Sequence, residues 1–202
     1  MKTDIERTAR MAVAAAAACA LCAMAGCAAP GGAEGHFRGA GDDTNVYVSP
    51  GHSSIRKVAV LPFKAPTELI GTAVSDQILT ELLRTGRYEM VERSQMAQVL
   101  GEQELSMAGL SAGKAAEIGA MLGADGVIIG TVSEYEKVAH RGSTIPVVGI
   151  SARMIDTQSG RIVWSSDVAE RARNSSATLS EHSRKVVHEL IAGVFFKMQS
   201  VR

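Results

Sequence analysis

The chain has 202 residues, of which 46% are hydrophobic and only 4% aromatic, and its 21 basic side chains balance its 21 acidic ones. With no net positive charge and no basic stripe, the sequence lacks the electrostatic pattern of a nucleic-acid-binding protein. The length suits one domain of about 150 residues preceded by a segment of a different kind.

The first 26 residues have the composition of a secretory signal peptide. Lys2, Arg7 and Arg10 give a weakly positive start, and an alanine-rich apolar run follows over residues 11–23. This run is too short and too rich in alanine for a permanent membrane helix, which needs about 20 strongly apolar residues. We therefore expect export of the chain and removal of residues 1–26.

The end of this segment resembles the lipobox of bacterial lipoproteins, with Met24, the small residues Ala25 and Gly26, and then Cys27. By that resemblance Cys27 becomes the lipidated first residue, with the several acyl chains that durable membrane anchoring requires. The next residue is Ala28 and not Asp, which by resemblance to lipoprotein sorting favours the outer membrane over the inner one. The alternative is an ordinary signal peptide cut elsewhere, with Cys27 incidental.

Acylation at Cys27 would also account for the cysteine content. Cys19 and Cys22 would leave with the signal peptide, and the remaining thiol would be blocked by lipid. We therefore expect neither an internal disulfide nor thiolate catalysis.

Residues 27–54 are expected to form a lipidated flexible tether. The segment is rich in Gly, Ala, Ser and Asp and contains Pro30 and Pro50, a composition that does not favour a packed core. The folded domain is therefore expected over residues 55–202.

The folded part has the periodicity of an α/β domain, a mixed sheet covered by helices, in the order βαβααβββα. Strands are predicted over residues 55–63, 88–91, 126–135, 147–155 and 161–171. Helices are predicted from Thr67 to Gly86, from Ser94 onward, from Ser111 to Gly123, and over residues 179–198. Asp156 and Gly160 favour a tight hairpin between the last two strands.

One short motif resembles the nucleophile site of serine hydrolases. Gly109, Ser111 and Gly113 match the G-x-S-x-G pattern, which works only where a strand turns sharply into a helix. Here residues 102–107 look helical, and Ser111 has the simpler role of a helix N-cap. A periplasmic hydrolase that uses Ser111 is kept as a remote alternative.

No metal, cofactor or acid–base site is predicted. His182 and His188 are six residues apart on one helix, which separates their faces, unlike the spacing of a helical zinc pair. Glu134 and Glu136 are expected on a solvated strand face. The histidines are all expected to be solvated: His36, His52, His140, His182 and His188.

Five phrases in order resemble the CsgG family, the lipoproteins of curli production and transport. They are Val58-Ala59-Val60-Leu61-Pro62-Phe63, Glu81-Leu82-Leu83-Arg84-Thr85-Gly86, residues 88–95, residues 123–132, and Ile155-Asp156-Thr157-Gln158-Ser159-Gly160. The resemblance implies a periplasmic α/β domain related to the N-terminal domain of TolB-like proteins.

The sequence departs from that family at one point. The curli channel subunit, as the family implies, inserts two β-hairpins into the outer membrane, each with strands of about 9–11 residues and alternating apolar positions. Between Tyr135 and Ile145, and between Arg171 and Leu179, the connections are short and polar. We therefore expect the periplasmic domain without membrane-inserted hairpins.

These observations predict a non-enzymatic outer-membrane lipoprotein, lipidated at Cys27, that binds protein partners in envelope assembly or secretion. A ring-forming subunit of a curli-like export channel is the alternative. Phe196 is a candidate interface residue, because adjacent Phe195 and Phe196 point about 100° apart on a helix and cannot both lie at the centre of one buried stripe. The alternative is that a broad apolar stripe buries both.

Overall fold

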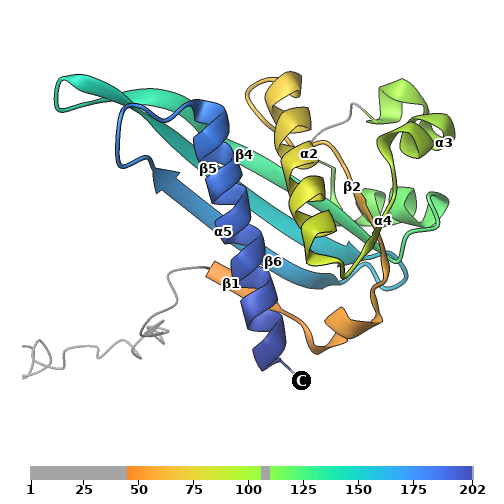
Figure 1. Cartoon of the computed structure of the whole chain (residues 1–202). Coiled ribbons are helices and arrows are strands. Elements are labelled where there is room, and N and C mark those ends of the chain that lie inside the picture. Colours follow the sequence, from red (N-terminus) through yellow and green to blue (C-terminus); the bar gives the residue numbers. More distant parts are fainter. Residues whose placement is uncertain (1–44, 106–109, 202) are drawn as a thin grey trace, which may run out of the picture. The chain divides into compact units, whose positions relative to one another are not determined.

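The computed structural model describes residues 45–105 and 110–201. Six strands form one mixed sheet in the order β1-β6-β5-β4-β2-β3 (Figure 1). The strands are β1 Asn45–Val48, β2 Lys57–Val60, β3 Glu89–Met90, β4 Gly126–His140, β5 Ser143–Asp156 and β6 Ile162–Arg171. β2 pairs in parallel with β3 and β4, whereas β4, β5, β6 and β1 form an antiparallel series.

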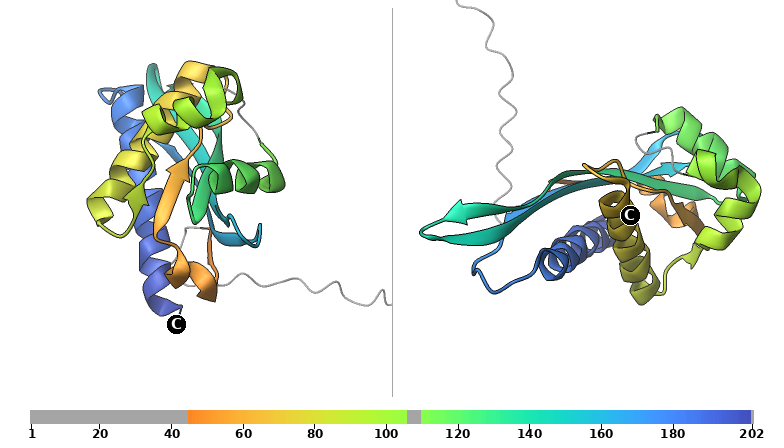
Figure 2. Two further views of the ribbon diagram at one scale, coloured as in Figure 1. Left: turned by 90° about the vertical axis from the view of Figure 1, so that its right-hand side faces the viewer. Right: turned by 90° about the horizontal axis from the view of Figure 1, so that it is seen from above.

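Two long helices cover one face of the sheet (Figure 2). They are α2, Glu68–Thr85, and α5, Leu179–Ser200. α2 begins and ends as predicted, because the Thr67 hydroxyl accepts a hydrogen bond from the Ile70 N–H and Gly86 closes the helix at a φ of 64°. α5 begins with a capping box between Thr178 and Glu181.

Two shorter helices cover only part of the other face. α3, Arg93–Leu105, and α4, Ala112–Met121, pack over β2, β4 and the end of β5 through a small cluster that includes Met96, Ile118 and Ile129. The outer parts of β5, β6 and β1 have no helix on this side among the described residues, as the view from above shows (Figure 2). We call this uncovered surface the open face.

The main core lies between the sheet and the helices α2 and α5. Trp164, Phe63 and Leu190 are among its fully buried side chains. Phe63 lies so close to β4 that a Cβ at residue 130 would come within 2.3 Å of its ring. Gly130 is therefore required by packing and not by backbone conformation.

Residues 45–54 belong to the folded domain, so the expected tether is wrong over this stretch. β1 pairs antiparallel with β6, with Val48 opposite Trp164, and a 3-10 helix follows over Pro50–Ser54. Val46 and Val48 alternate toward the core, so packing favours a strand here although the surrounding composition is polar.

The hairpin of β4 and β5 is longer than predicted. β4 continues five residues past Tyr135 to His140, and β5 already begins at Ser143. The two-residue turn has positive φ at both positions, 46° at Arg141 and 79° at Gly142, which suits the twist of a tight hairpin. Residues 133–149 form the outer part of this hairpin, which we call the arm; it projects beyond α5 (Figure 2).

None of the helices within residues 45–105 and 110–201 combines the length and the apolar character needed to cross a bilayer.

Candidate functional site

Ser111 is the N-cap of α4. Its hydroxyl accepts a hydrogen bond from the Lys114 N–H at 3.3 Å. The helix α3 precedes it, and no strand leads into this turn within the described part of the chain. The local context therefore matches the predicted capping role and not the strand–turn–helix that a serine nucleophile requires.

The described residues contain no group of three or more His, Cys, Asp or Glu side chains arranged to hold a metal ion. The histidines instead serve different structural roles, so the expectation that all are solvated is wrong for two of them. His182 is buried, with Nε2 at 2.9 Å from the Glu170 carbonyl oxygen, and His52 is buried, with Nδ1 at 2.9 Å from the Ser49 carbonyl oxygen. His36 lies outside the described residues.

The exposed histidine, His188, helps to join α5 to α2. Its Nδ1 lies 2.7 Å from the Glu81 carboxylate. The same carboxylate also forms an ion pair with Arg84 at 3.4 Å. Deeper between the helices, the buried Ser183 hydroxyl donates to the Gln77 side chain at 2.7 Å. Polar contacts thus fix the register of the two parallel helices, which sequence periodicity does not specify.

A groove of about 250 Å³ lies between α2 and α5. Its lining carries both signs of charge, contributed by Asp76, Glu81, Arg84, Arg184 and His188. Side chains of both signs, part of them paired with one another, suit contact with a protein surface better than the binding of a small ion.

Large apolar side chains lie exposed on the same two helices. Phe196 is 69% exposed on α5, whereas Phe195 turns inward and packs edge-on against Tyr88, with 6.1 Å between ring centroids. Leu69 and Leu83 of α2 are 79% and 53% exposed. Sequence reasoning singled out Phe196 but missed the two leucines, because they share a helix with many buried apolar residues.

Burial raises the pKa of the Tyr88 hydroxyl, against the opposing effect of Arg87, whose guanidinium lies over the ring at 5.4 Å. A hydrogen bond to Glu170 at 2.6 Å raises the pKa of Lys185. The first shift arises from burial and the second from a contact between α5 and β6, so both have a structural cause.

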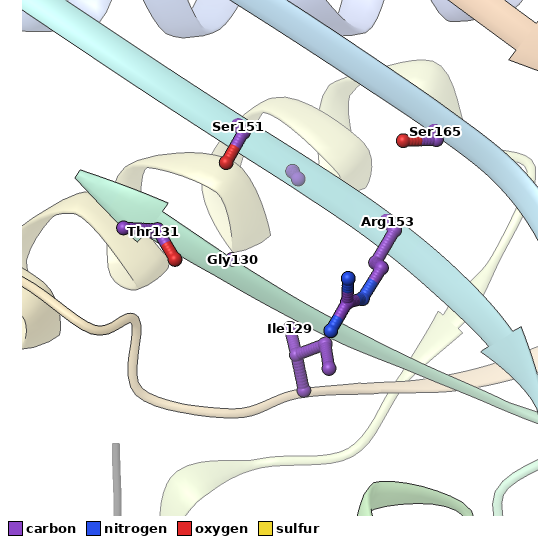
Figure 3. A pocket seen from close by; sticks show the side chains of 7 residues that line it. Ile129, Gly130, Thr131, Ser151, Arg153 and Ser165 are labelled. Carbon is purple, nitrogen blue, oxygen red and sulfur yellow. The ribbon is translucent and has the colours of Figure 1, made fainter. Parts of the chain in front are cut away.

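The open face carries a shallow hollow of about 130 Å³ (Figure 3). Arg153 lies across it from β5 toward Ile129 of β4, and hydroxyls of neighbouring strands line it. Glu134 and Glu136 are exposed, as predicted for a solvated strand face. Because Thr131, Ser151 and Ser165 are small, this surface is flat enough for another protein segment to pack on the sheet.

Cys27 and the first part of the expected tether lie outside the described residues, so the lipidation site stays a prediction.

Comparison with known proteins gives one family. The family model described as "Curli production assembly/transport component CsgG" matches residues 42–186. No curated protein matches the chain by sequence.

Solved structures share the fold. A PelC dodecamer from Paraburkholderia phytofirmans superposes with a TM-score of 0.55 at 20% identity, over 75% of this chain and 95% of that one. The lipoprotein GNA1162 from Neisseria meningitidis gives a TM-score of 0.52 at 18% identity, over 72% of this chain and 99% of that one. At these identities the likeness concerns the fold.

Proposed function

The chain belongs to the CsgG family, and from this premise we propose that it is a non-catalytic lipoprotein on the periplasmic side of the outer membrane. Lipid on Cys27 anchors it, and its α/β domain binds protein partners, copies of itself included, in envelope assembly or secretion. The observation that carries the proposal is the family match, which covers all six strands and the first turns of α5.

Several features of the domain support a binding role. Ser111 is used as a helix cap, and the described His, Cys, Asp and Glu side chains form no group of three or more that could hold a metal ion. The surface offers instead a mixed-charge groove between α2 and α5 and, elsewhere on the same two helices, exposed apolar residues that include Leu83 and Phe196. A polar surface with a few apolar anchors is typical of protein–protein interfaces.

Self-association is supported by one of the structural neighbours, which is described as a dodecamer. A ring-forming subunit of a curli-like channel is the second candidate, because such a channel is also built by self-association. The arm, however, carries Glu134, Glu136 and Lys137 in exposed positions, and charged groups are costly where a strand faces lipid. We therefore favour an assembly held on the membrane surface by its lipid anchors.

Photo-crosslinking in living cells tests the binding role. A photoreactive amino acid is placed at Phe196 in the full-length chain, and in a matched strain at Glu117, an exposed position on α4. We expect a discrete adduct from position 196, either to a second copy or to one envelope protein, and none from position 117. If positions 196 and 117 give the same weak and heterogeneous crosslinked products, the proposed interface is wrong.

A further inference from the structure

The hollow on the open face combines one cation with three hydroxyls. Arg153 of β5 and the hydroxyls of Thr131, Ser151 and Ser165 line it, and they come from three neighbouring strands (Figure 3). Its volume of about 130 Å³ is room for about four water molecules, since each takes about 30 Å³ in the liquid. Pockets for drug-sized ligands begin at about 300 Å³. The hollow therefore suits one small polar group that projects from a larger molecule.

A second cation borders the hollow from the other side of β4. Lys64 follows β2 and pairs in parallel with Thr131, so the two side chains leave the sheet on the same face. Lys64 is exposed, and Arg153 extends from β5 toward Ile129 of β4, so the two cations approach β4 from its two sides (Figure 3). Neither cation forms an ion pair among the side chains that the structure describes.

One acidic residue, Asp167, shares a row of the sheet with two of these hydroxyls. Asp167 pairs with Ser151, which in turn pairs with Thr131. Asp167 is not among the residues that line the hollow, and its carboxylate makes no ion pair with Arg153. The charge of the lining is therefore positive, which favours an anionic ligand.

From this arrangement we infer that the hollow receives a carboxylate from an acidic segment of a partner protein. The Arg153 guanidinium can donate two parallel hydrogen bonds to a carboxylate, and the hydroxyls of Thr131 and Ser151 can donate further ones. Lys64 supplies a second positive charge as a flexible point charge.

The backbone around the hollow favours a carboxylate over a phosphate. Phosphate sites in proteins typically add backbone N–H groups from a helix N-terminus or a glycine-rich loop. Here the lining backbone belongs to strands whose N–H groups are directed at their neighbours in the sheet. Only side-chain donors face the ligand, and the fork of Arg153 matches the two oxygens of a carboxylate.

The surroundings of the hollow favour a protein segment over a free acid. The hollow is shallow, so a small acid alone would gain few contacts there. Tyr47 of β1 is 56% exposed and lies in one row with Ser165 and Arg153, which adds an aromatic contact of the kind that is enriched at protein interfaces. This inference rests on the proposed protein-binding role and adds a second contact, on the face of the sheet that α5 and Phe196 do not cover.

Binding of a fluorescent hexaglutamate peptide to the full chain in detergent, followed by fluorescence anisotropy, tests the site. We expect Arg153→Gln to weaken binding about tenfold, because a hydrogen-bonded charge is lost. Arg153→Lys keeps the charge without the fork and should recover only part of the affinity. Lys64→Gln should weaken binding about two- to fivefold. Both positions are exposed, so the melting temperatures should stay near that of the wild type.

The matched control is Arg173→Gln, which removes an exposed arginine from the loop between β6 and α5 and should leave binding unchanged. A hexaglutamine peptide should not bind. Acetate and inorganic phosphate are compared as competitors at equal ionic strength, and we expect phosphate to displace the peptide no better than acetate does.

The outcomes separate this inference from the proposed function. A loss confined to the Arg153 and Lys64 variants supports the carboxylate site. No binding to the wild type, or an equal loss in Arg173→Gln, overturns it, and displacement by phosphate at one tenth of the acetate concentration assigns the hollow to phosphate instead. A discrete crosslink from position 196 without peptide binding overturns only the carboxylate site, whereas peptide binding that depends on Arg153 without that crosslink overturns only the helix-pair interface.

Discussion

At the residue scale, two adjacent aromatic side chains on α5 take opposite roles. Phe195 packs against Tyr88 in the core, and Phe196 is 69% exposed. The 100° rotation between successive helix positions makes this separation unavoidable once the apolar stripe of α5 faces the sheet. An exposed phenylalanine contributes little to the core, and exposed aromatic side chains often serve as anchors in protein–protein interfaces.

We predict that Phe196→Ser weakens assembly or partner recovery while the melting temperature stays nearly unchanged. Phe195→Ser is the matched control, because it removes a ring packed on the core and should cost about 2–3 kcal/mol of unfolding free energy. Thermal melting and crosslinked yield, measured on both variants, check the pair. A large stability loss in Phe196→Ser with association intact would show that the ring serves the core.

A second prediction at this scale concerns Gly130. A Cβ here would lie 2.3 Å from the Phe63 ring and 2.5 Å from the Ser151 carbonyl oxygen, so Gly130→Ala should destabilise the domain by about 1–3 kcal/mol. Gly113→Ala on α4 meets no atom within 4 Å and should be neutral or stabilising by up to about 1 kcal/mol. Urea unfolding distinguishes the two, and equal effects would contradict the packing argument.

At the scale of elements, periodicity predicts the nine main helices and strands in their observed order, because most of them bury a regular apolar stripe. Periodicity does not predict segments that are held extended by pairing with neighbouring strands and that bury no apolar stripe. β1 lies in a polar sequence context, and residues 136–140 of β4 are predicted as a loop because their neighbours in the sheet, and not a core, hold them extended. The hydrogen bond from Ser183 of α5 to Gln77 of α2 could not be predicted either, since helix periodicity does not specify how two helices align.

The start of α5 should make stability depend on pH. The Thr178 backbone N–H donates to the Glu181 carboxylate, and this hydrogen bond holds the pKa of Glu181 below its ordinary value of 4.5. The stabilisation is therefore present above about pH 4.5 and is lost as the pH falls through the lowered value. Glu181→Gln should flatten this acid limb of the unfolding free energy measured in urea.

Thr178→Ala serves as the companion variant, because it removes the hydroxyl that caps the Glu181 N–H and should cost about 0.5–2 kcal/mol at neutral pH as well. If Glu181→Gln retains the full acid dependence of the wild type, the capping box is not its source.

At the scale of the whole molecule, the domain is asymmetric in a way that suits assembly on a surface. One face of the sheet is closed by α2 and α5, the other is partly open, and the arm extends the sheet beyond the helices (Figure 2). The exposed apolar side chains of the helix pair, Phe196 among them, are the surface that we propose for partner binding. Under the proposed function, the lipid on Cys27 would hold such a domain at the membrane.

The anchor at Cys27 is therefore the central claim, and metabolic labelling with a palmitate analogue tests it most directly. Wild-type protein and the matched control Cys22→Ser, which alters the expected signal peptide only, should carry the label and sediment with the outer membrane. Cys27→Ser should lose both the label and the membrane fraction. Equal labelling of Cys27→Ser and wild type would contradict the account.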